Sequence, residues 1–168
     1  MKNIFKKGFT LSEVLIALSI IGVVAALTVP QVIYNYNEKA FEALELKAKD
    51  TLTQAFDIYL SDIGKNQLKT SDFNTKAKLE EFLTHYTRGK AIDFPTNYRG
   101  ENGGPMGVAG SNNYGCVKTK DSIMICLAPI SSTTKFVVFD LNGSAGPNMQ
   151  NKDLNLSYRY DINGRVYK

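Results

Sequence analysis

Residues 9–29 read FTLSEVLIALSIIGVVAALTV, and this stretch decides how the fold is predicted. Its only charged side chain is Glu13, and the segment before it carries three lysines, Lys2, Lys6 and Lys7. At about 1.5 Å of helical rise per residue, a run of this length spans the roughly 30 Å hydrocarbon core of a bilayer. We therefore expect one transmembrane helix at residues 9–29, with a cytoplasmic N-terminus and the later chain outside the bacterial inner membrane.

Two other interpretations of this stretch compete with the transmembrane helix. A buried core helix is disfavoured by the length of the run and by its basic flank. A secretory signal peptide fits better, because Val24-Ala25-Ala26 provides small residues for conventional cleavage after Ala26. That interpretation gives no role to Glu13, although a carboxylate in a membrane segment is costly and usually serves a function.

The residues around Glu13 resemble a known processing signal. The run Gly8-Phe9-Thr10-Leu11-Ser12-Glu13-Val14-Leu15 is similar to the class III signal of type IV pilins and type II secretion pseudopilins. This resemblance implies that a prepilin peptidase removes a leader of residues 1–8 and methylates the new N-terminus. The cut would fall between Gly8 and Phe9, so that Phe9 becomes N-methylphenylalanine.

The resemblance also implies partners and a location. The mature chain would polymerise through its apolar helix with identical or homologous subunits, in a periplasmic or surface filament. An inner-membrane assembly platform and an ATPase would drive this step, and before assembly the helix would contact inner-membrane lipid.

A charge argument assigns Glu13 a role in assembly. Cleavage of the leader creates an α-amine with a reference pKa of about 7.7–8.0, which is largely cationic at neutral pH. Pairing Glu13 with this amine on a neighbouring subunit offsets the cost of placing both charges in lipid. We expect Glu13 to set the register at which a subunit enters the filament.

After the apolar run the sequence becomes amphipathic. Apolar residues recur every three or four positions from Phe41 to Ile63, which predicts a helical stripe that faces a core. We expect one long helix at residues 9–63, with Gly64 as its C′ stop and a bend at Pro30. The second half of this helix is predicted to pack on a globular head.

The rest of the chain predicts a head of the α+β class. Residues 64–115 are expected to connect the two parts, with a glycine-rich loop and a short helix at 72–88 that begins at an Asp72 N-cap. Residues 116–168 contain β-branched and aromatic runs between Gly, Pro and Asn, which predict antiparallel strands. Asn163-Gly164 predicts a type I′ hairpin turn. A long helix packed on a C-terminal antiparallel sheet is the pilin-like layout that the resemblance implies.

Cys116 and Cys126 lie on either side of a turn predicted near Lys120-Asp121. Two strands joined by this turn would bring the two sulfurs together, and oxidation is permitted outside the inner membrane. We expect a disulfide, and the alternative is a pair of buried free thiols.

The segment from Asp140 to Asn148 offers oxygen ligands on a tight loop, as Ca²⁺ requires. It resembles the Asp-x-Asn-Gly…Gly-Pro-Asn segment of some pseudopilin-like proteins, and major pseudopilins bind calcium in C-terminal loops. Asp140, Asn142, Asn148 and Asp153 are the predicted ligands. Turn chemistry alone is the alternative, because Asp161-Ile162-Asn163-Gly164 repeats the pattern at a hairpin turn.

These observations predict a non-enzymatic structural subunit, a pseudopilin or minor pilin of a type IV filament or type II secretion-like system. His85 is the only histidine, and no metal-ligand cluster or nucleophile elbow accompanies it. One alternative is a filament-tip module that captures DNA or a secreted substrate; another is a secreted protein cleaved after Ala26. Removing the three leader lysines lowers the net charge from +4 to +1, which disfavours nonspecific nucleic-acid binding.

Overall fold

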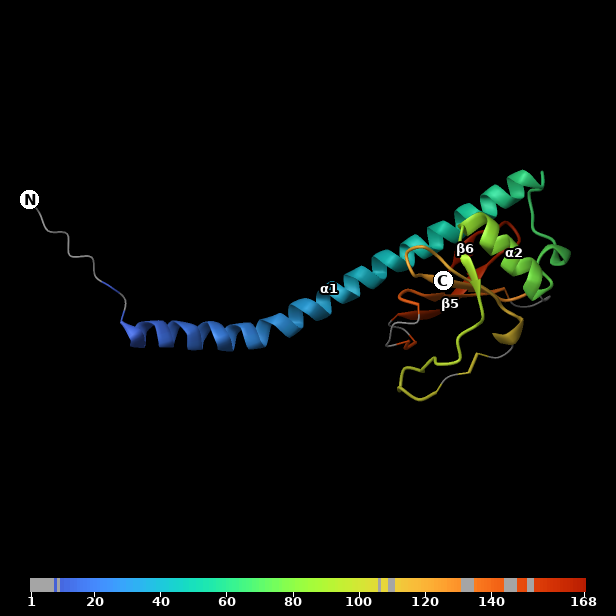
Figure 1. The fold of residues 1–168 in the computed structure, drawn as a ribbon. Helices are drawn as coiled ribbons and strands as arrows, with labels where there is room; N and C mark the ends of the chain where they lie inside the picture. Colours follow the sequence, from blue (N-terminus) through green and yellow to red (C-terminus); the bar gives the residue numbers. More distant parts are fainter. Residues whose placement is uncertain are drawn as a thin grey trace, which may run out of the picture. The chain divides into compact units, whose positions relative to one another are not determined.

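The computed structural model describes residues 8, 10–105, 107–108, 111–130, 135–143, 148–150 and 153–168. The chain is α+β, with a long N-terminal helix followed by a six-stranded antiparallel sheet (Figure 1). It divides into two compact units, residues 1–39 and 40–168. The pilin-like layout expected from the sequence is confirmed.

The first unit contains the apolar part of helix α1 (Leu11–Asp62). This is the one described helix that is long and apolar enough to cross a membrane; its most apolar 18-residue window has a mean hydropathy of 2.3 and no buried residue. Ser19 and Thr28 donate their hydroxyls to the carbonyls of Leu15 and Val24, at 2.8 and 2.9 Å. These two polar groups are therefore satisfied inside the helix, as an apolar environment demands.

The second unit begins with the amphipathic part of α1. Its buried residues are spaced three and four apart and face the sheet; they are Ala48, Leu52, Ala55, Phe56 and Leu60. The helix ends at Asp62, and Gly64, the predicted C′ residue, has a φ of 61°. The amide of Lys65 donates to the Leu60 carbonyl at 3.0 Å and that of Gly64 to Ser61 at 3.1 Å, which is the Schellman arrangement.

The sheet is a meander in which every strand pairs with the next along the chain. Its strands are β1 (Lys90–Ile92), β2 (Gly115–Lys118), β3 (Met124–Leu127), β4 (Phe136–Asp140), β5 (Leu154–Tyr160) and β6 (Val166–Tyr167). β1 lies in the region that the sequence assigned to a connection. Lys90 and Ala91 are exposed there, so the strand lacks the alternation that would have revealed it.

Alternate residues of each strand point to opposite sides of the sheet. Both sides are buried, each in its own apolar cluster. One face, with Val117, Ile125 and Phe139, packs against α1 and α2 (Lys76–Thr87). The other face, with Cys126 and Val138, packs against residues of the segment between β1 and β2 and against neighbours from the strands. The head therefore has two apolar layers that share one sheet.

The predicted start of the short helix is wrong in detail. The short helix does not begin at Asp72: a separate 3-10 turn, η1 (Thr70–Asp72), precedes α2, whose N-cap is Thr75. The Thr75 hydroxyl accepts the amide of Lys78 at 3.4 Å, while Asp72 accepts the amide of Lys69 at 2.8 Å. Thr75 is thus the N-cap of α2, whereas Asp72 is the last residue of η1 and its carboxylate accepts the amide that precedes that turn.

The last hairpin also differs from the type I′ turn predicted at Asn163-Gly164. Gly164 has a φ of 76°, whereas Asn163 is not left-handed. The amide of Gly164 donates to the Asp161 carbonyl at 3.1 Å, and that of Asp161 to the Arg165 carbonyl at 3.0 Å. The loop thus has three residues, a tight turn followed by a left-handed glycine, which is the next commonest hairpin connection.

One carboxylate joins α1 to the end of the chain within the second unit. Oε1 of the half-buried Glu45 accepts the Tyr158 hydroxyl at 2.7 Å, Nδ2 of Asn155 at 2.9 Å and Nζ of Lys168 at 2.9 Å. Three donors from the last part of the chain therefore converge on a single helix residue.

Candidate processing and assembly site

The first turn of α1 holds Glu13 through its own chain. Thr10 donates both its backbone N–H and its hydroxyl to Oε2 of Glu13, each at 2.8 Å. The amide of Glu13 donates in return to Oγ1 of Thr10 at 3.3 Å. This reciprocal pattern is a capping box, in which the side chains at the N-cap and three residues later satisfy each other's free amides.

The sequence predicted that Glu13 pairs with a terminal amine, and it missed Thr10. The local signal was present, because Thr10-Leu11-Ser12-Glu13 has the Ser/Thr-x-x-Glu spacing of a capping box directly before an apolar run. Within one subunit, Thr10 gives the carboxylate two donors. The pairing with an amine from another chain remains a prediction, since a single chain is described.

Gly8, on the leader side of the expected cut, is exposed. Phe9 and residues 1–7 lie outside the described residues, so the cleavage and methylation of this bond remain predictions. Pro30 lies inside α1, and the bend expected there also remains a prediction.

The apolar side chains that follow Glu13 have no partners within the described chain. Between Leu11 and Val29 every Leu, Ile and Val exposes between 43% and 78% of its surface. Soluble monomers rarely expose a continuous apolar surface of this extent, so lipid or other protein chains must cover it. The capped carboxylate of Glu13 lies at the start of this surface.

Residues 5–29 carry the prokaryotic N-terminal methylation motif. This motif is the signal of type IV pilins and pseudopilins, and the match confirms the resemblance read from Gly8 to Leu15. The methylation motif covers the first part of α1 and none of the head. No curated protein and no solved structure matches the chain.

The methylation motif is accompanied by a disulfide in the head. Cys116 and Cys126 lie directly opposite each other in the β2–β3 pair, with their Cα atoms 4.1 Å apart, and they form the predicted bridge. Both residues are fully buried, on the sheet face that contacts the β1–β2 connection. The alternative of two free thiols is therefore wrong.

The residues predicted to bind calcium come together where β4 meets β5. Asp140 pairs with Leu154 across these strands, and the Leu141 amide donates to the Asp153 carbonyl at 2.8 Å. The Asp153 carboxylate accepts the amides of Asn148 and Met149 at 2.6 and 2.8 Å. Each oxygen of this carboxylate therefore already accepts one backbone hydrogen bond.

Asp140 is the less satisfied of the two buried carboxylates. Its Oδ1 accepts the Asn142 amide at 3.3 Å, and the Tyr98 hydroxyl and the Gly143 amide also interact with this carboxylate, although its buried Oδ2 has no well-aligned hydrogen bond in the described chain. Burial, and next the charge of Asp153, raise the pKa of Asp140 to about 7. Among the described residues no three His, Cys, Asp or Glu side chains are grouped to hold a metal ion.

Proposed function

We propose that this chain is a structural subunit, a pseudopilin or minor pilin, of a type IV filament or type II secretion-like system. The observation that carries the proposal is the methylation motif at residues 5–29, which starts an exposed apolar helix with Glu13 in its first turn. Proteins with this motif are structural rather than enzymatic. The subunit would polymerise through α1 once prepilin peptidase has removed residues 1–8 and methylated Phe9.

The proposal includes a single-pass inner-membrane precursor with a cytoplasmic N-terminus. An assembly platform and an ATPase would extract this precursor from the lipid into a filament. The buried disulfide Cys116–Cys126 supports a head in an oxidising compartment, since such bridges persist outside the cytoplasm.

Mass spectrometry of the N-terminal peptide from the mature protein tests the proposal. We expect a peptide that begins at N-methylated Phe9. A mature N-terminus at Leu27 would instead support conventional signal cleavage after Ala26, and a retained leader would also contradict the proposal. The alternative role is binding of DNA or a secreted substrate at a filament tip. An electrophoretic mobility-shift assay with the full chain in detergent, at several salt concentrations, tests whether the protein binds DNA.

A second proposal is that the corner between β4 and β5 binds Ca²⁺. The buried Oδ2 of Asp140, which has no well-aligned hydrogen bond in the described chain, supports it, because a cation would satisfy this oxygen better than the nearby Tyr98 hydroxyl does. Asn142, Asn148 and Asp153 would complete the site with their remaining oxygen lone pairs.

Thermal unfolding of the full chain in detergent, with Ca²⁺ or with EDTA, tests the calcium proposal. Calcium should raise the midpoint temperature of unfolding above its value in EDTA. Asp140→Asn should remove most of this increase. Asp161→Asn is the matched control, because Asp161 occupies the same Asp-x-Asn-Gly pattern but accepts the amides of Asn163 and Arg165 at 2.8 and 2.9 Å. Equal midpoints with Ca²⁺ and EDTA would contradict the proposal.

A further inference from the structure

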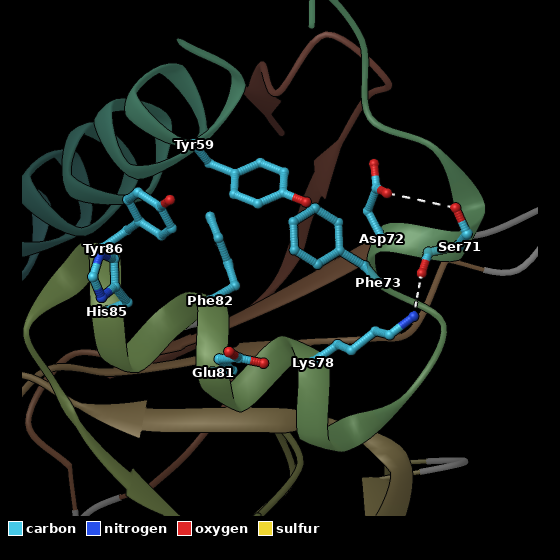
Figure 2. A pocket seen from close by; sticks show the side chains of 9 residues that line it. All are labelled: Tyr59, Ser71, Asp72, Phe73, Lys78, Glu81, Phe82, His85 and Tyr86. Carbon is cyan, nitrogen blue, oxygen red and sulfur yellow. Dashed lines mark hydrogen bonds between the residues drawn. The ribbon is translucent and has the colours of Figure 1, made fainter. Parts of the chain in front are cut away.

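The head has a surface hollow of about 470 Å³ between the end of α1, the η1 turn and α2. Tyrosine and phenylalanine rings line it, from Tyr59, Phe73, Phe82 and Tyr86, together with the imidazole of His85, whose centroid lies 4.7 Å from that of Tyr86 (Figure 2). All lie in the second unit of the chain. Neither the proposed filament function nor the calcium proposal uses this surface.

The four rings form one continuous aromatic cluster. Tyr59 lies 5.2 Å from Phe73, 5.4 Å from Phe82 and 5.6 Å from Tyr86, measured between ring centroids. Phe73 and Phe82 are buried, whereas Tyr59 and Tyr86 are half-buried and present part of their rings to the hollow. The Tyr59 and Tyr86 rings are nearly perpendicular, at 85°, so the edge of one meets the face of the other beside the two buried phenylalanines.

Two carboxylates lie in or beside the hollow, those of Glu81 and Asp62. The exposed carboxylate of Glu81 lines it and forms no ion pair with any described residue. The Tyr86 hydroxyl donates to Oδ2 of Asp62 at 3.0 Å. Asp62 is also the last residue of α1, where the helix dipole adds partial negative charge. Burial and the interaction with Asp62 raise the pKa of Tyr86.

The ammonium groups nearby lie at the opposite end. Lys78 donates to the Ser71 carbonyl at 2.6 Å, and Figure 2 shows it directed towards Ser71 and away from Tyr86. Lys65 lies 3.7 Å from the Asp72 carboxylate, which is itself largely buried. Lys78 is the one lysine that lines the hollow, and its ammonium is held at the Ser71 end, so the Tyr86 end holds tyrosine, the His85 imidazole and no lysine.

We propose that this hollow binds an arginine side chain from a partner protein, in contact with the exposed parts of Tyr59 and Tyr86 and paired with Glu81. A guanidinium is attracted to the faces of aromatic rings and is more weakly hydrated than an ammonium, so it loses less on leaving water. A carboxylate or phosphate ligand would be repelled by Glu81 and Asp62. The hollow is also within the size range of ordinary ligand sites.

Nuclear magnetic resonance on the full chain in detergent micelles, with ring-labelled tyrosine, tests the proposal. The probe is N-acetylarginine N-methylamide, and its citrulline counterpart has nearly the same shape without the charge. We expect saturable shifts of the Tyr59 and Tyr86 ring signals with the arginine probe, and binding about two- to fivefold weaker with citrulline, as one exposed cation–π contact predicts.

Glu81→Gln should weaken binding of the arginine probe several-fold. Glu80→Gln is the matched control on the same helix, because Glu80 lies 3.6 Å from Lys76 and does not line the aromatic hollow. Unchanged Tyr167 signals would report that each variant keeps its fold. Equal binding of the citrulline probe, or equal effects of the two glutamate variants, would overturn the proposal and leave the filament function untouched.

Discussion

Glu13 has one partner in the isolated subunit and is proposed to gain another in the filament. In the described chain its Oε2 accepts both donors of Thr10. A carboxylate held in this way is less costly in lipid than a bare one, because two of its hydrogen bonds are kept. Assembly would then add, or substitute, the ammonium of a neighbouring Phe9. The capping box would therefore lower the cost of keeping Glu13 in the membrane before the subunit assembles.

The first prediction concerns this carboxylate. Glu13→Val should insert in the membrane normally, because it removes the one charge of the apolar segment. It should assemble poorly, since an unpaired amine buried in a filament costs about 3–5 kcal/mol. Filament yield measured by sedimentation and electron microscopy, against the amount of protein in the membrane fraction, checks both parts.

Ser12→Ala is the matched control for Glu13→Val. It changes a neighbouring polar residue of the same helical turn and should assemble like the wild type. Normal filaments from Glu13→Val would disprove the proposed role of the carboxylate.

At the scale of elements, α2 approaches β2 so closely that a side chain cannot fit between them. A Cβ placed on Gly115 would overlap Leu79, with the Glu80 amide nitrogen 2.9 Å away. Gly115→Ala should therefore lower the free energy of unfolding by about 1–3 kcal/mol, because a rigid helix backbone cannot yield. Urea unfolding of the full chain in detergent measures this loss.

Gly104→Ala provides the comparison for Gly115→Ala. No atom lies within 4 Å of a Cβ at Gly104, and its φ is not left-handed, so its stability should stay within about 0.5 kcal/mol of the wild type. Equal stabilities of the two variants would show that α2 and β2 are not packed this closely.

A second prediction about elements concerns Glu45, which joins α1 to β5. Glu45→Ala leaves the donors of Asn155, Tyr158 and Lys168 without their shared acceptor. We expect a loss of about 1–3 kcal/mol, limited by the access of water to this half-buried site. Unfolding by urea checks it, and Glu42→Ala, an exposed residue on the same helix, should have little effect.

For the whole molecule, local signals in the sequence predicted the long helix, its C′ residue Gly64 and the methylation motif. Features that depend on contacts between distant parts of the chain were harder to predict from the sequence. The three-residue β1 has no local signature, and the corner of Asp140 and Asp153 depends on the β4–β5 register, which the sequence does not determine. The aromatic hollow joins Tyr59 of α1 to Tyr86 of α2, so it too required the folded chain.

The disulfide provides the last prediction, because it links β2 to β3 on the sheet face that contacts the β1–β2 connection. Cys116 and Cys126 close a loop of ten residues' separation, for which chain entropy predicts about 3 kcal/mol of stabilisation. The double variant Cys116→Ala/Cys126→Ala should lose about this much in urea unfolding of the full chain. Because both sulfurs are fully buried, a mild reductant should not open the bridge in the native protein, although it should once urea is added. Thiol labelling with and without urea measures this difference, and rapid labelling of the native protein would show that the β1–β2 connection leaves this face of the sheet accessible.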